Sequence, residues 1–417
     1  MRIQKCKGSR DLSPEEMVRF RLIDRAFREC CLRWGYEEVK TPTLEYLHLF
    51  TSTGTLTPSL LGKVYSFLDW DGWSGERVVL KPDSTIPIAR LYIDSMEEKE
   101  LAKLFYVSNV FIFEETGRET REKWQCGAEL IGGHSPLADV ELIMLALEVL
   151  ERLGLEDIEL RLSHADLIRA LLVKLGLNPE EQTRIFDQIL DGDTEALTRM
   201  GSRRTEPGSV LPLLLDPTQK SSRFLKNLKA LFAQNLSEVE PCLADFINII
   251  NLLEALGCKY QIDLASGRGF EYYTGVIFQL FKGEERVGGG GRYDALIPLM
   301  GGRDIPASGF ALYLDRLMNL VKLETQAEPL APRILVRVEP GEPEVMKEGF
   351  GIASRLREAG YVAEFNLGGQ EPTNLRWTLD VQSQAPLFVL TDPVKRKRFE
   401  AQTANEVLTL LEEEGNG

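Results

Sequence analysis

The chain has 417 residues, of which 43% are hydrophobic and 27% are charged, values ordinary for a folded protein of two or three domains. Its 49 Lys and Arg stand against 64 Asp and Glu, and the net charge of −15 opposes broad binding to a phosphate backbone. Because no apolar run has the roughly 18 residues of a membrane helix and the start lacks the apolar segment of a signal peptide, a cytoplasmic location without membrane contact is expected.

A helix is expected at the beginning of the folded part. Ser13 is placed to cap it, and apolar residues recur at helical spacing from Phe20 to Trp34 until Gly35 ends the helix. The segment YEEVKTPTLE then predicts a strand that ends near Pro42.

Further strands and helices follow in the first three quarters of the chain. Short strands are expected at residues 63–69, 77–80 and 104–113. A helix from Asp139 buries one apolar face. Residues 166–257 are helical and poor in strands, so we interpret them as a helical insertion in a core domain of residues 1–325.

The end of the chain predicts a small α/β domain at residues 334–417, after a polar, proline-containing linker. It is expected to be shortened, since no complete strand is predicted after LFVLTD and the basic run from Lys395 to Arg398 indicates a solvated turn. This domain has 9 Lys and Arg against 14 Asp and Glu, so tRNA is not an expected partner.

Two neighbouring motifs carry most of the chemistry. SGRGFEYYTGVIF, residues 266–278, predicts a strand that places Arg268, Tyr272 and Tyr273 among glycines, and a buried arginine typically faces a ligand or another partner. VGGGGRYDAL, residues 287–296, predicts a second strand whose glycines allow close approach to the backbone. Together they predict the floor of a small-molecule pocket. The six cysteines lack CxxC spacing and the three histidines are far apart, so neither a metal nor another cofactor is expected.

These motifs resemble the histidyl-tRNA synthetase family, whose signature is R-G-x-D/E-Y-Y-T-G followed by G-G-R-Y-D. The resemblance implies an α+β fold, in which a class II aminoacyl-tRNA synthetase-like antiparallel sheet is packed with helices. It also implies that the C-terminal domain is related to an anticodon-binding domain, and that the first helix and the strand ending near Pro42 form the interface of a homodimer.

Other segments resemble the part of the family that holds histidine. By resemblance, Asp83 and Thr85 in LKPDSTIPIAR receive the α-ammonium group. In WQCGAELIG, Gln125 and Glu129 line the histidine pocket, and residues four apart on a strand share a face. The resemblance also implies that Tyr272 and Tyr273 complete the imidazole pocket and that Arg268 holds the carboxylate. The same residues could instead form an internal network in which Glu129 neutralises Arg268.

The ATP half of the family site is only partly present. Arg316 and Arg121 match arginines that lie along ATP and reach its distal phosphates. The second class II motif, F-R-x-E, has Ile112 in place of its arginine. Losing that contact to the α-phosphate should cost about 3 kcal/mol of transition-state stabilisation, unless Arg118 or Lys123 compensates.

Ile112, the shortened tail and the acidic charge favour the non-aminoacylating members of the family, the regulatory subunits of ATP phosphoribosyltransferase. That resemblance implies partnership with the short catalytic subunit in the first step of histidine biosynthesis, histidine as a possible ligand, and no catalytic residue in the chain itself. An active histidine–tRNA ligase is the alternative, supported by Arg121, Arg268 and Arg316. A sensing module for tRNA or an amino acid, unconnected with either pathway, also stays open.

Overall fold

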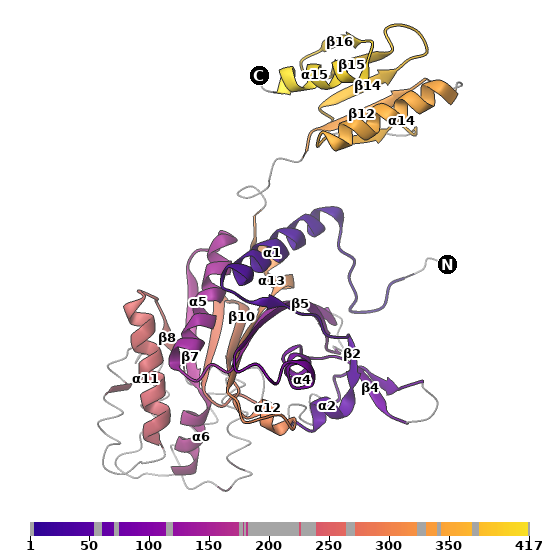
Figure 1. Ribbon diagram of the computed structural model, residues 1–417. Coiled ribbons are helices and arrows are strands. Elements are labelled where there is room, and N and C mark those ends of the chain that lie inside the picture. The colour runs from indigo at the N-terminus through magenta and orange to yellow at the C-terminus, as the bar shows by residue number, and fades with distance from the viewer. Residues whose placement is uncertain are drawn as a thin grey trace. The chain divides into compact units, whose positions relative to one another are not determined.

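The structure is a computed structural model whose chain divides into two compact units, Met1–Lys322 and Leu323–Gly417. Figure 1 shows both units. The residues that the structure describes are 4–53, 61–70, 75–113, 120–174, 178, 181, 225–226, 239–263, 272–322, 331–339, 343–368 and 375–415. Within them, no helix is both long and apolar enough to cross a membrane.

An eight-stranded sheet forms the centre of the first unit, in the order β1-β5-β6-β11-β10-β9-β7-β8. Neighbours pair antiparallel except β1 with β5 and β7 with β8. In sheet order, the strands are β1 Glu37–Glu38, β5 Ala102–Phe111, β6 Glu122–Ile131, β11 Ala307–Tyr313, β10 Glu285–Arg292, β9 Val276–Lys282, β7 Ile158–His164 and β8 Gln261–Ile262.

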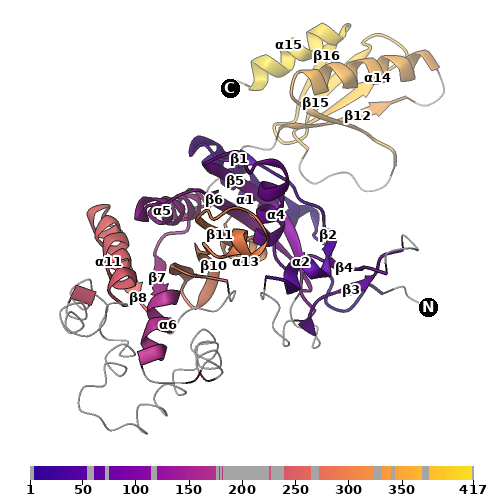
Figure 2. The same cartoon turned by 60° about the horizontal axis from the view of Figure 1, so that its bottom comes forward.

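Helices cover both faces of this sheet, with α1 and α5 on one side and α4 and α12 on the other (Figure 1). The first face carries α1 Pro14–Arg33, α5 Pro136–Arg152, α11 Val239–Ala255 and α13 Leu314–Leu320. The second face carries α2 Leu47–Thr51, α4 Thr85–Ser95 and α12 Leu296–Leu299, beside a small sheet of β2 Leu44–Tyr46, β4 Arg77–Leu80 and β3 Ser66–Leu68. Helix α6, Ala165–Lys174, packs against α11 near β7 and β8 (Figure 2).

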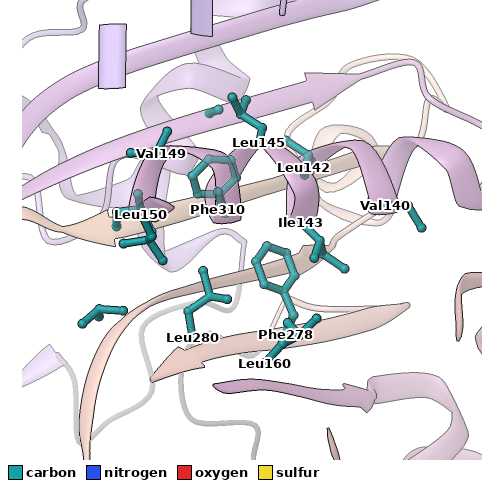
Figure 3. Close-up of a cluster of buried hydrophobic side chains, with 14 of the residues drawn as sticks. Val140, Leu142, Ile143, Leu145, Val149, Leu150, Leu160, Phe278, Leu280 and Phe310 are labelled. Carbon is teal, nitrogen blue, oxygen red and sulfur yellow. The ribbon is translucent and has the colours of Figure 1, made fainter. Parts of the chain in front are cut away.

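The larger core lies between the sheet and α1, α5, α11 and α13. Figure 3 shows apolar side chains of α5, among them Leu142 and Ile143, next to Phe278 of β9 and Phe310 of β11. The rings of Phe278 and Phe310 have centroids 6.4 Å apart, and both side chains are almost fully buried. This packing fixes which face of each strand points away from the core, and therefore where the site can form.

Helix α1 begins as predicted, because Ser13 and Glu16 form a reciprocal capping box. The strand predicted to end near Pro42 is shorter than expected. The pairing of β1 is limited to Glu37 and Glu38, and β2 belongs to the small sheet. Proline has no N–H to donate to a ladder, which separates the two pieces.

A buried ion pair joins α5 to the sheet. Arg292 of β10 donates to Asp139 of α5 at 2.8 and 3.0 Å and to the carbonyl of Gly133 at 3.0 Å. Ser308 of β11 donates to the same carboxylate at 2.7 Å. The arginine of the GGRYD motif therefore belongs to a hydrogen-bond network that joins α5, β10 and β11.

The second unit is a five-stranded sheet in the order β13-β12-β14-β15-β16, covered by α14 and α15. Its elements are β12 Arg333–Val338, α14 Pro343–Glu358, β13 Val362–Phe365, β14 Trp377–Val381, β15 Phe388–Asp392, β16 Lys397–Ala401 and α15 Ala404–Gly415. The expectation that no strand follows LFVLTD is wrong, because β16 pairs with β15 over five residues. Asp392 accepts the N–H groups of Val394 and Lys395, both at 2.8 Å, and this turn leads Lys397 and Arg398 into the new strand.

The first glycine-rich strand also begins later than predicted. Tyr272 and Tyr273 precede β9, which starts at Val276. Of the expected helical insertion, the two ends, α6 and α11, and residues 178, 181 and 225–226 are described, and the rest of residues 166–257 lies outside the described residues.

Candidate ligand-binding site

The site begins with glycines on the face of the sheet that points away from the larger core. Strands β6, β11 and β10 place Glu129, Gly309 and Gly291 side by side in one row. A Cβ at Gly309 would lie 1.7 Å from Glu129 Oε2, and one at Gly127 would lie 2.3 Å from the Tyr106 hydroxyl oxygen. Any larger residue would therefore occupy the space of the polar groups, so glycine is required at both positions.

A cavity of about 30 Å³ lies above this floor. Polar and aromatic side chains dominate its wall. The lining residues are Asp83, Thr85, Tyr106, Gln125, Tyr272, Tyr273, Arg286, Gly289, Tyr293, Gly309, Phe310, Ala311 and Tyr313.

The structure brings most of the predicted site residues together. Asp83, Thr85, Gln125, Tyr272 and Tyr273 all line the cavity. Glu129 lies just beneath the wall, where it accepts hydrogen bonds from two of the lining tyrosines. Arg268 lies outside the described residues. What these residues bind stays a prediction.

Glu129 is the most deeply enclosed acid of the site, with 1% of its surface exposed. It accepts hydrogen bonds from the hydroxyls of Thr85 at 2.8 Å, of Tyr106 at 3.4 Å and of Tyr293. Burial raises the pKa of Glu129 to about 8, although the hydrogen bonds from Tyr293 and Thr85 oppose that rise. At neutral pH the protonated form therefore predominates, and a ligand cation or N–H donor would favour the ionised form.

Asp83 supplies a second buried acid at the same end of the cavity. Its Oδ1 accepts the N–H of Ile86 at 2.9 Å, at the start of α4. Burial raises the pKa of Asp83 to about 6 despite this bond and the nearby charge of Lys81. Lys81 itself is buried, with its Nζ 3.0 Å from the Thr41 hydroxyl, and burial lowers its pKa to about 8.

The two arginines expected at the ATP half lie outside the cavity wall. The guanidinium of Arg121 lies 4.4 Å from the Phe113 ring centroid, and its side chain occupies the space where Gly8 would carry a Cβ. The Arg316 guanidinium pairs with Glu285 at 3.1 Å and lies 5.4 Å from the Tyr313 ring centroid.

Ile112 follows β5 directly, and its N–H donates to the carbonyl of Arg121 at 2.9 Å. Its half-buried aliphatic side chain brings no charge to that end of the strand. Arg118, one of the two possible substitutes, lies outside the described residues. Lys123 belongs to β6 and is not part of the cavity wall.

Four polar lining residues, Tyr106, Arg286, Tyr293 and Tyr313, were not predicted from the sequence. Tyr293 stands in the quoted GGRYD motif, so that motif was a signal for it. Tyr106 could be found only once the pairing of β5 with β6, which places it opposite Gly127, was known. Tyr313 lies at the end of β11, in the segment YLDRL that contains Arg316, and Arg286 lies near the start of β10, just before the glycine-rich motif. Among the described residues, no cluster of His, Cys, Asp and Glu could hold a metal ion.

The raised pKa of Glu129 predicts a pH dependence of stability. The unfolded acid has a pKa near 4.5 and the folded one near 8. Between these values the unfolded chain releases a proton that the folded chain keeps, so stability is fully present below pH 4.5 and is lost as the pH rises through 8. The slope is at most about 1.4 kcal/mol per pH unit.

The variant Glu129→Gln cannot ionise, so its free energy of unfolding should fall less than that of the wild type between pH 5 and 8, by up to that slope. Urea unfolding at several pH values measures the difference. The matched control Glu141→Gln, on α5 at the other face of the sheet, should keep the wild-type slope. Equal slopes for wild type and Glu129→Gln would contradict the assignment.

Comparison with known proteins agrees with this geometry. A sequence model of the histidyl-tRNA synthetase family matches residues 8–317. An ATP phosphoribosyltransferase regulatory subunit of Dehalococcoides mccartyi is 52% identical over 409 residues, 98% of each chain. A histidine–tRNA ligase of Methanocaldococcus jannaschii is 34% identical and covers 90% of this chain and 88% of its own.

Solved structures agree as well. One described as an ATP phosphoribosyltransferase regulatory subunit/histidyl-tRNA synthetase from Bacillus halodurans C matches with a TM-score of 0.75 at 26% identity, over 89% of this chain and 95% of that one. The expected class II synthetase-like α+β fold is thereby confirmed. The chain therefore belongs to the histidyl-tRNA synthetase family, and it is more similar to the regulatory subunit than to the ligase.

Proposed function

We propose that this protein is a regulatory subunit of ATP phosphoribosyltransferase, without catalytic activity of its own, that acts in the cytoplasm on the short catalytic subunit in the first step of histidine biosynthesis. One observation carries the proposal. Over 98% of its length the chain is 52% identical to a protein of that name, against 34% for the ligase compared above.

The phosphate-binding side of the site supports the same choice. Adenylation requires fixed positive charge around the α-phosphate of ATP. Ile112 provides none, Arg316 is paired with Glu285, and Arg121 packs on Phe113. An active histidine–tRNA ligase remains the second candidate, because the family match spans residues 8–317 and includes both arginines.

The amino-acid side of the site is better preserved. Two buried acids, Asp83 and Glu129, stand at one end of the cavity together with the Thr85 hydroxyl. A ligand with an ammonium group and an imidazole N–H offers the donors that such acids accept. We therefore propose histidine, or a close analogue, as the ligand and feedback signal.

Histidine binding is expected to release a proton, because an N–H donor at Glu129 favours the ionised carboxylate. Calorimetry in two buffers of different ionisation enthalpy should therefore give different heats. Glu129→Gln and Asp83→Asn should weaken binding about tenfold or more, whereas the control Glu141→Gln should not. Absence of both heat and thermal shift at high histidine concentration would contradict the ligand.

The missing phosphate contact predicts no measurable histidine-dependent exchange between ATP and pyrophosphate. Ile112→Arg alone should not restore the exchange, because Arg121 and Arg316 have other partners. The ligase from Methanocaldococcus jannaschii, assayed in parallel, is the positive control. Robust exchange by the wild-type chain would favour the ligase instead.

The regulatory role predicts a complex with the short catalytic subunit. Co-expression should yield a complex that co-purifies, and the phosphoribosyltransferase activity of that subunit should change when this chain is added. Lack of co-purification would count against the regulatory role.

We also propose a homodimer, because the small sheet exposes apolar side chains, those of Leu44, Tyr46, Phe67 and Leu68. Light scattering that reports a monomer at micromolar concentration would count against the dimer.

A further inference from the structure

Arg286 is the one basic side chain among the described residues that line the cavity. Its guanidinium carbon lies 5.6 Å from the Tyr313 ring centroid. One guanidinium nitrogen lies 3.0 Å from the position that a Cβ on residue 289 would occupy. The positive charge therefore rests over the glycine floor, inside the site.

A β-bulge brings Arg286 to this face. Arg286 pairs with Phe281 and Gly288 with Leu280, so Val287 is the extra residue of β10. Strict alternation from Gly289 would place Val287 in the cavity and Arg286 in the core. Instead Val287 is fully buried in the larger core and Arg286 lines the cavity.

Arg316 holds this arrangement in place. It donates to the backbone carbonyl of Arg286 at 3.0 Å and pairs with the carboxylate of Glu285 at 3.1 Å. Its guanidinium also lies against the Tyr313 ring. Arg316 thus fixes the backbone at the bulge, while the side chain of Arg286 reaches the cavity.

The cavity is consequently polar from end to end. Gly291 lies in the row of Glu129, and Gly289 lies two residues along β10, which is about 7 Å at the rise of a strand. Acids that accept N–H groups stand at one end and a guanidinium at the other. A small ligand with a donor group at one end and an anion at the other matches both.

We propose that Arg286 is a specificity-determining residue that receives the anionic group of the ligand, a role that resemblance had assigned to Arg268. The proposal deepens the proposed function and rests on it where the ligand is histidine. A planar guanidinium binds a carboxylate or a phosphate through two parallel hydrogen bonds. The anion is the carboxylate of a free amino acid or the phosphate of a nucleotide, and the experiment distinguishes these sources.

The test titrates the full-length protein with histidine, with histidinol, which has an alcohol in place of the carboxylate, and with AMP. Arg286→Gln should weaken the binding of histidine about 10- to 100-fold and leave the affinity for histidinol close to that of the wild type. The histidine affinity of Arg286→Lys should lie between those of Arg286→Gln and the wild type, because lysine keeps the charge but not the planar guanidinium that forms two parallel hydrogen bonds. Arg161→Gln, which removes an arginine stacked on Phe281 outside the cavity wall, is the matched control.

The outcomes separate the two proposals. Unchanged histidine affinity in both Arg286 variants, or equal losses for histidine and histidinol, would overturn the role of Arg286 while histidine remains the ligand. If the wild type does not bind histidine but binds AMP, and the Arg286 variants bind AMP more weakly, the result would support an anion site at Arg286 and contradict histidine as the ligand. A wild type that binds none of the three would overturn both.

Discussion

The absence of side chains at four strand positions is the constraint on which the site depends. On the face of β6, β10 and β11 that points away from the larger core, four positions carry no side chain: Gly127, Gly289, Gly291 and Gly309. Side chains of the site lie directly against the backbone there. On the opposite face the same three strands contribute Ala128, Val287 and Phe310 to the larger core. The sheet can therefore pack against the larger core on one face and leave a cavity at these positions on the other.

Much of this could be predicted because the information is local. A capping box marks the start of α1, strand parity puts Gln125 and Glu129 on one face, and long glycine motifs point to the floor. What could not be predicted depends on pairing between distant segments. The bulge that turns Arg286 into the cavity exists only in the register of β9 and β10, and the polar strand β16 is recognisable only beside β15.

The two halves of the site predicted from the sequence differ in the structure. The end that receives donors retains two buried acids with a network of hydroxyls, in which removing one partner would leave a buried group without its hydrogen bond. Where the resemblance predicts contacts to ATP, Ile112 carries no charge, and Arg121 and Arg316 contact Phe113 and Glu285. In the proposed function, recognition of a small molecule is therefore separate from the chemistry of activating it, since different segments of the chain carry the residues expected for each.

Part of the cavity wall lies outside the regular strands. Tyr272 and Tyr273 lie on the connection before β9, which starts at Val276. A ligand that favours one position of these two rings changes the populations of two conformations, and a partner that distinguishes them must, by reciprocity, alter the affinity for that ligand. A wall carried by a connection can thus provide what a wall made only of paired strands would lack, a coupling between occupancy and shape.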